Sequence, residues 1–146
     1  MTRSAVLAAL VAASAVHADA PKLPSTEDAF AAHLADAKWT APKAPEIPAG
    51  VMVSPAAVEP GSGASVGYAK FPAGYLFPMH WHSVAEYSVL LSGKATFTLE
   101  GKEHTMLPGS YIVIPAKAPH QLRCAPGAEC VVLTRRAGPT DYHWVK

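Results

Sequence analysis

The sequence has 146 residues, which is enough for one domain of ordinary size. Half of the residues are hydrophobic and 16% are charged, a composition that excludes a disordered or collagen-like chain. The formal net charge of +1 gives no sign of the basic surface that nucleic-acid binding or a polybasic membrane patch needs. The 14 prolines and 10 glycines favour a turn-rich, all-β fold over a helical bundle.

Residues 1–20 are expected to form a secretory signal peptide that is removed from the mature protein. Arg3 provides a short positive start, and residues 4–16 form an alanine-rich apolar run that is too short to span a bilayer comfortably. Small residues follow at the spacing of a cleavage site, after either Ala18 or Ala20. The alternative is an amphipathic helix, but the run has no polar face. We therefore expect a periplasmic or secreted protein with no membrane association after cleavage.

The proline-rich residues 21–60 are expected to form an N-terminal arm that contains one short helix. Ser25 can cap this helix, with Asp28 at its third position. Phe30 and Leu34 would then share one face of the helix. The prolines further along this arm predict extended chain.

From Ala64 onward, short apolar or alternating segments recur, with turns rich in proline and glycine between them. Eight strands are predicted, over residues 64–71, 80–91, 95–99, 103–106, 111–114, 121–124, 130–134 and 142–145. This number and spacing of strands predict a sandwich or small barrel for residues 61–146.

Both cysteines lie in this β region, where Cys124 and Cys130 flank a turn-forming stretch at residues 125–129. On two paired strands joined by this loop, their side chains can face each other and form a disulfide. Two buried free thiols are the alternative. A disulfide would agree with export, because it persists in an oxidising compartment.

Two of the seven histidines stand two residues apart, at His80 and His82. On a strand, residues at this spacing point to the same face, with Trp81 opposite them. Glu86 has the same parity and can share that face if the strand runs on with little distortion. His120 follows a turn bounded by prolines and can supply a fourth group from a neighbouring strand. Because this set would be costly to bury without a cation, three imidazoles and a carboxylate predict a divalent metal site.

An isolated H-x-H pair is also compatible with surface residues beside a turn, but the surrounding sequence resembles the cupin superfamily. Residues 74–93, GYLFPMHWHSVAEYSVLLSG, match the first cupin motif, G-x5-H-x-H-x3-E-x6-G, at every defined position. Residues 109–124, GSYIVIPAKAPHQLRC, resemble the second motif, G-x5-P-x-G-x2-H-x3-N. Lys117 replaces the usual glycine and Cys124 the usual asparagine, and neither change removes a metal ligand.

The resemblance implies a jelly-roll β-barrel that binds one divalent metal through His80, His82, Glu86 and His120. Copper or zinc is expected if affinity decides, whereas iron, manganese or nickel would need availability or geometry to overcome the usual order of affinities. Cupins also commonly pair as homodimers through strand edges. The arm could cover such an edge or reach a partner, and both alternatives stay open.

Three classes of function stay open. The first is a metal-dependent oxidoreductase of the dioxygenase type that acts on a small organic substrate. The second is a non-redox lyase or isomerase, in which Glu86 leaves the metal and acts as a base. The third is a module that binds metal or a small ligand without turnover. Arg123 is expected to face outward, so no charged residue identifies the substrate, and a compact, weakly charged ligand is expected.

Overall fold

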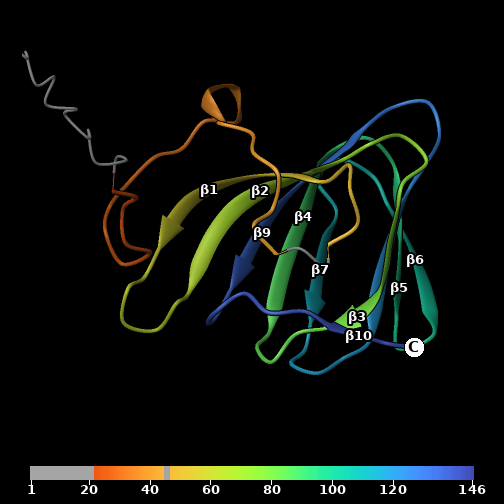
Figure 1. Cartoon of the computed structure of the whole chain (residues 1–146). Coiled ribbons are helices and arrows are strands. Elements are labelled where there is room, and N and C mark those ends of the chain that lie inside the picture. Colours follow the sequence, from red (N-terminus) through yellow and green to blue (C-terminus); the bar gives the residue numbers. More distant parts are fainter. Residues whose placement is uncertain (1–21, 45–46) are drawn as a thin grey trace, which may run out of the picture.

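The computed structural model describes residues 22–44 and 47–146, and the predicted signal peptide lies outside the described residues. Two five-stranded antiparallel sheets pack around one core, as Figure 1 shows. The described residues contain a single helical element, the 3-10 turn η1 (Leu34–Asp36). Within that part of the chain, no helix is long and apolar enough to cross a membrane. The predicted all-β sandwich or barrel is confirmed.

The first sheet has the strand order β1-β2-β9-β4-β7, and the second has the order β10-β3-β8-β5-β6. In chain order the strands are β1 (Met52–Val58), β2 (Ser65–Phe71), β3 (Leu76–Trp81), β4 (Glu86–Ser92), β5 (Ala95–Leu99), β6 (Lys102–Met106), β7 (Tyr111–Ile114), β8 (His120–Cys124), β9 (Cys130–Arg136) and β10 (His143–Trp144). Sequence neighbours are therefore often split between the two sheets, and the site described below draws on both of them.

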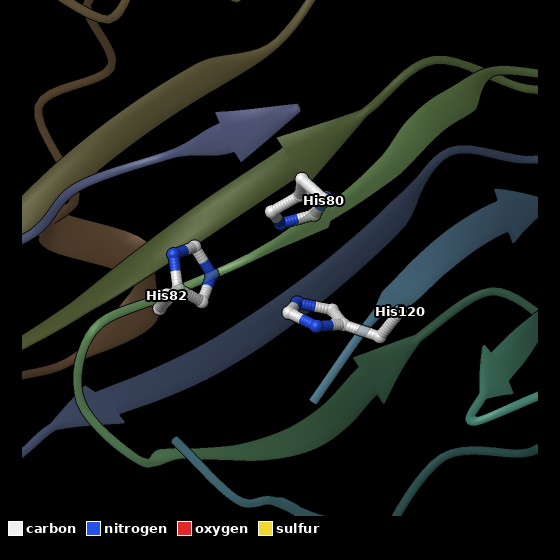
Figure 2. Close-up of side chains that lie close together, drawn as sticks. All are labelled: His80, His82 and His120. Carbon is white, nitrogen blue, oxygen red and sulfur yellow. The ribbon is translucent and has the colours of Figure 1, made fainter. Parts of the chain in front are cut away.

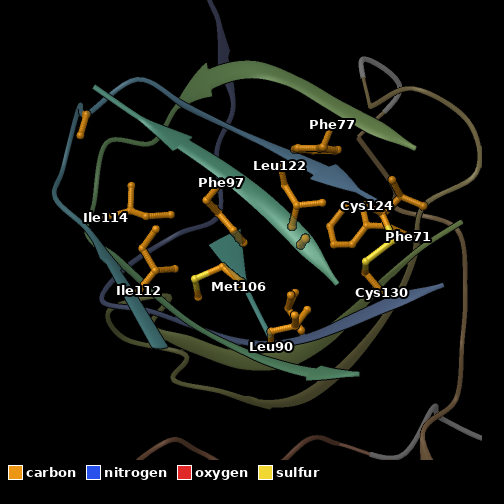
Figure 3. Close-up of a cluster of buried hydrophobic side chains, with 14 residues drawn as sticks. Phe71, Phe77, Leu90, Phe97, Met106, Ile112, Ile114, Leu122, Cys124 and Cys130 are labelled. Atoms are coloured by element: carbon orange, nitrogen blue, oxygen red, sulfur yellow. A yellow bond between two sulfur atoms is a disulfide. The ribbon is translucent and has the colours of Figure 1, made fainter. Parts of the chain in front are cut away.

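The core lies between the sheets, where alternate residues of the strands turn inward (Figure 3). The rings of Phe71 in β2 and Phe77 in β3 meet edge to face, with 5.6 Å between their centroids. Cys124 ends β8 and Cys130 begins β9, and their Sγ atoms lie 2.10 Å apart, at bonding distance. This buried cysteine pair connects the two sheets at one point and is compatible with an oxidising compartment.

The single strand predicted over residues 80–91 is in fact two strands in different sheets. β3 ends at Trp81, and β4 begins at Glu86 in the opposite sheet. The chain crosses between the sheets at residues 82–85, which contain no proline or glycine to mark the change of direction. As a consequence, His80 and Glu86 approach each other across the barrel and not along one strand.

The N-terminal arm differs from the prediction in two places. The sequence does not predict β1, because Pro55 interrupts its apolar pattern; the register of β1 is irregular at this residue. The expected helix is reduced to η1, which buries no residue. Phe30 and Leu34 stay 40% and 38% exposed, so no packing supports a longer helix.

The arm covers part of an exposed sheet edge, one of the two alternatives that the sequence left open. β1 is the edge strand of the first sheet. Thr40 of the arm exchanges two backbone hydrogen bonds with Val53 of this strand, at 2.9 and 2.8 Å. This pairing places the neighbouring residues of the arm against the outer rim of the barrel.

Lys117 keeps the turn in which a glycine is usual. Its φ is 65°, the left-handed conformation that glycine adopts without steric cost. Its backbone N–H donates a hydrogen bond of 2.8 Å to the carbonyl of His82. The lysine therefore leaves the turn in place beside the predicted metal ligands.

The chain packs closely against Gly93, beside the cysteine pair. Its φ is +82°, and a Cβ there would lie 2.5 Å from the Glu129 carbonyl oxygen and 3.0 Å from the Cys130 Cα. Gly101 has a similar φ of +80° but open space around it. We expect Gly101→Ala to lower the free energy of unfolding by about 1 kcal/mol. Gly93→Ala should lower it by about 3 kcal/mol or more, because backbone atoms must also move.

Urea unfolding of the two variants measures this difference. Equal losses for Gly93→Ala and Gly101→Ala would contradict the close approach of the chain at Gly93.

Candidate metal centre

Three buried histidines converge inside the barrel, as Figure 2 shows. His80 in β3 and His120 in β8 are partners in the register of the second sheet, and His82 follows directly after β3. Their exposed fractions are only 2 to 3%. One ligand nitrogen from each ring lies within 4.8 Å of the others. The structure thus brings together three of the four predicted metal ligands.

Each of the three imidazoles is oriented by a backbone carbonyl. The Nδ1 atom of His80 lies 2.7 Å from the Pro78 oxygen, and that of His120 lies 2.9 Å from the Ala118 oxygen. The Nδ1 atom of His82 contacts the Asp141 oxygen in the same way. A carbonyl only accepts hydrogen bonds, so each Nδ1 carries a proton and each Nε2 is the ring nitrogen left to bind a metal ion.

This pattern of tautomers fits a metal ion. Histidines that bind metals commonly donate their second N–H to a carbonyl or carboxylate, which fixes the ring and the tautomer. The Nε2 atom of His82 is buried, and no hydrogen-bond partner for it is found among the described residues. A divalent transition metal would use all three lone pairs at once.

The imidazoles of His80 and His120 are also in the protonation state that binds metals. Burial, assisted by the neighbouring imidazoles of His120 and His82, lowers the pKa of His80 to about 3. Burial is likewise the main cause that lowers the pKa of His120 below its ordinary value. Both rings are therefore neutral at neutral pH, and a metal ion does not have to displace a proton from them.

Glu86 reaches the site from the first sheet, as the first residue of β4. Its Oε2 atom lies 3.1 Å from Nε2 of His82 and 2.6 Å from Nη2 of Arg136. Ser88 donates a hydrogen bond of 2.9 Å to its other oxygen, Oε1. In the described part of the chain, the mutually close ligand atoms come from the three imidazoles, without Glu86. The carboxylate thus lies beside the site but is paired with Arg136, and its role as fourth ligand stays a prediction.

Glu86 and Arg136 form a buried pair of opposite charges. Burial by itself raises the pKa of Glu86, but the Arg136 guanidinium and the neighbouring His82 imidazole hold that pKa well below its usual range. Burial favours the neutral form of Arg136, yet the nearby carboxylate keeps the pKa of Arg136 above its ordinary value. Both groups are therefore charged at neutral pH. A carboxylate with a low pKa is a weak base, which favours a role in binding over one in proton transfer.

The histidine site opens on a cavity of about 600 Å³. His80, His120, Glu86 and Arg136 line it near the site. Its neighbouring walls are mostly apolar and aromatic, from Phe77, Phe97, Leu122, Val132 and Tyr142. Residues 40–44 and Ile47 of the arm close another side. The cavity is therefore large enough for a small molecule, with His80 and His120 in its wall.

The sequence prediction missed Arg136, whose charge changes the chemistry of the cavity. The predicted strand stopped at Thr134, whereas β9 continues to Arg136. Within β9, residues of the same parity as Cys130 turn toward the interior. Extending the strand by two residues would therefore have placed Arg136 inside the barrel. Arg123 is exposed, as expected.

The motifs, the fold and the site point to one family. A family model for the cupin domain matches residues 67–134 of the chain. The matched segment contains all four predicted metal ligands. The protein is a member of the cupin superfamily.

Solved structures share the fold of this cupin at low sequence identity. The polyketide cyclase RemF from Streptomyces resistomycificus has 18% identity and a TM-score of 0.66, over 82% of this chain and 87% of that one. An oxalate oxidase has 18% identity and a TM-score of 0.61, over 82% and 66% of the two chains. Salicylate 1,2-dioxygenase from Pseudaminobacter salicylatoxidans has 11% identity and a TM-score of 0.53, over 60% and 26%. No curated protein sequence matches the cupin.

The predicted ligand set can be tested by metal stoichiometry. We expect the double variant His80→Ala and His120→Ala to lose stoichiometric binding of a divalent metal, because one donor atom remains of the three that lie together. Glu86→Gln should weaken the metal affinity by about tenfold if the carboxylate is a ligand. Dialysis against the metal followed by elemental analysis measures both effects.

His104→Ala is a matched control for this test, because His104 is an exposed histidine in β6. It should keep the wild-type stoichiometry. Full metal content in the double variant would refute the site.

The buried imidazoles also predict how the metal-free protein responds to acid. His80 has a native pKa of about 3, so between pH 6.5 and that value the unfolded chain binds a proton that the folded chain does not. The free energy of unfolding should therefore fall with falling pH, by up to about 1.4 kcal/mol per pH unit for each such group. The depressed pKa of Glu86 acts in the same direction below about pH 4.3, where the unfolded carboxyl becomes protonated.

Denaturant unfolding in the presence of a chelator, from pH 7 to 4.5, measures this dependence. His80→Gln removes one titrating group. It should therefore reduce the slope of the unfolding free energy against pH by an amount equivalent to at most one bound proton. An unchanged slope in this variant would show that His80 does not resist protonation in the fold.

Proposed function

We propose that this cupin is a metal-dependent oxidoreductase of the dioxygenase type that acts on a small organic substrate. The observation that carries the proposal is the group of three buried, converging imidazoles, which opens on a largely apolar cavity of about 600 Å³. His80, His82 and His120 would hold one divalent metal, with Glu86 as the fourth ligand. When bound, a redox-active metal supplies coordination positions for oxygen and for a substrate.

The residues around the site would orient the ligands and keep water out. The ring of Phe77 packs edge to face on His80, with 4.8 Å between centroids, and Tyr142 lies at 5.6 Å from the same imidazole. Arg136 keeps the Glu86 carboxylate ionised, which is the form that a metal ion binds. These contacts support a site that is organised before a substrate enters.

The structural relatives agree with this proposal at the level of the fold. Two of them are named for oxidations, the oxalate oxidase and the salicylate dioxygenase. Because their identity to this chain is 18% or lower, they support a fold that hosts such reactions and do not identify the substrate.

We also propose that the protein is exported to the periplasm or the cell exterior. Residues 1–20 have the pattern of a signal peptide, and the buried cysteine pair is compatible with an oxidising compartment. In that compartment copper or zinc would bind such ligands most tightly. Of these two ions, copper is the one that can take part in oxidation.

A non-redox lyase or isomerase is the second candidate. It is favoured by the Glu86 carboxylate, which lines the cavity beside the imidazoles and could act as a base. The RemF relative is named as a cyclase. The low pKa that Arg136 imposes on Glu86 makes this carboxylate a weak base, so we rank this candidate below the oxidoreductase.

Oxygen consumption separates the two candidates. Protein loaded with copper, iron or manganese is mixed with small carboxylic, enolic and phenolic compounds in an oxygen electrode. We expect oxygen uptake that matches substrate loss with at least one metal. His120→Ala should reduce this rate by at least 100-fold, because its imidazole would hold the metal.

Turnover at the same rate without oxygen would contradict the oxidoreductase and favour the lyase or isomerase. Tight ligand binding with no turnover under either condition would favour a binding module.

A further inference from the structure

Arg136 places a positive charge inside the barrel. It is the last residue of β9, and its side chain is 16% exposed. The guanidinium lies 2.6 Å from the Glu86 carboxylate, hydrogen-bonds the Tyr142 side chain and lines the cavity together with His80 and His120. A buried cation beside a ligand cavity indicates a role in binding as well as in stability.

The guanidinium has binding capacity that the protein does not use. Its Nε atom is buried, and no hydrogen-bond partner for it is found among the described residues. Buried donors are nearly always paired in folded proteins. The planar arrangement of its N–H groups suits two parallel hydrogen bonds to one carboxylate.

A metal ion would change the charge balance around Arg136. Without metal, the charges of Glu86 and Arg136 cancel. With a divalent metal the same space has a net charge of +2, and Glu86 cannot satisfy both cations fully if it becomes a ligand. The third charged group that lines the cavity within the described residues, Lys43 of the arm, is exposed and adds to the positive side. The loaded cavity therefore attracts an anion.

We propose that Arg136 is a specificity-determining residue that binds the carboxylate of a small organic acid in the metal-loaded cavity. This inference rests on the metal site of the proposed function. The rest of the acid would be apolar, because Phe77, Phe97 and Leu122 form the neighbouring walls. The inference replaces the weakly charged ligand that the sequence led us to expect.

The exchange of partners makes metal and acid binding cooperative. When Glu86 binds the metal, its ion pair with Arg136 weakens, and among the described residues Glu86 is the only anionic partner of Arg136. The carboxylate of the acid then restores an ion pair to Arg136. A carboxylate should therefore bind more tightly to the metal-loaded protein. By thermodynamic linkage, the metal should bind more tightly by the same factor when the acid is present.

Calorimetric titration of the full chain tests the proposal without turnover. The probes are benzoate against benzamide and acetate against acetamide, with zinc as a redox-inert metal. We expect at least one carboxylate to bind the zinc-loaded protein at least tenfold more tightly than its amide, and at least tenfold more tightly than it binds the metal-free protein.

Arg136→Gln should lower the carboxylate affinity of the zinc form at least tenfold and leave the amide affinity unchanged. Arg136→Lys keeps the charge but loses the paired N–H groups, so it should give an intermediate affinity. Arg123→Gln removes an exposed arginine of β8 and should behave as the wild type. The comparisons of carboxylate with amide and of zinc-loaded with metal-free protein need no variant, so they hold even if Arg136→Gln fails to fold.

Two results would overturn the inference. One is a carboxylate that binds Arg136→Gln as tightly as the wild type, because the anion would then contact only the metal. The other is the absence of any preference for carboxylates over amides. Arg136-dependent binding without oxygen uptake would refute the oxidoreductase and keep the inference. Oxygen uptake that is equal for neutral and acidic substrates and unaffected in Arg136→Gln would refute the carboxylate-binding role of Arg136 and keep the oxidoreductase.

Discussion

Three backbone carbonyl groups orient the imidazoles of the candidate metal centre, and the rest of the site depends on them. The carbonyls of Pro78, Ala118 and Asp141 each accept a hydrogen bond from an imidazole Nδ1. The ligand nitrogens of the three rings lie within 4.8 Å of one another in a buried space. Such a group of lone pairs is unfavourable in a protein interior unless a cation joins it. A bound metal ion would therefore offset the unfavourable free energy of this arrangement.

The two sheets contribute different chemistry to the same space. The second sheet supplies neutral donors, through His80 of β3 and His120 of β8. The first sheet supplies charge, through Glu86 of β4 and Arg136 of β9, which are partners in its register. The imidazoles and the charged pair therefore come from different sheets and meet at one cavity, where Oε2 of Glu86 lies 3.1 Å from Nε2 of His82. A bound molecule can therefore contact a metal and an ionic group at once.

The sequence predicts the histidines well because their signal is local. His80 and His82 are two residues apart, and the spacing to His120 follows a recognisable motif. β1 is harder to predict because Pro55 interrupts its pattern, and Arg136 is missed because the predicted strand ends two residues before β9 does. The turn at residues 82–85 has no proline or glycine, so the sequence does not show that Glu86 belongs to the other sheet. Glu86 still lies beside His82, at 3.1 Å between Oε2 and Nε2, because the two sheets face each other across the barrel.

The contact between Asp141 and His82 has a consequence for the order in which the site is completed. Asp141 lies 59 residues after His82 in the chain, and Trp144 of β10 pairs with His80. In the chain, all four predicted ligands precede Asp141, whose carbonyl orients the His82 ring. A nascent chain that has reached only the end of β9 would hold the ligands without the carbonyl that fixes the His82 ring. The geometry of the candidate metal centre is therefore complete only when residues 141–144 have packed beside His80 and His82.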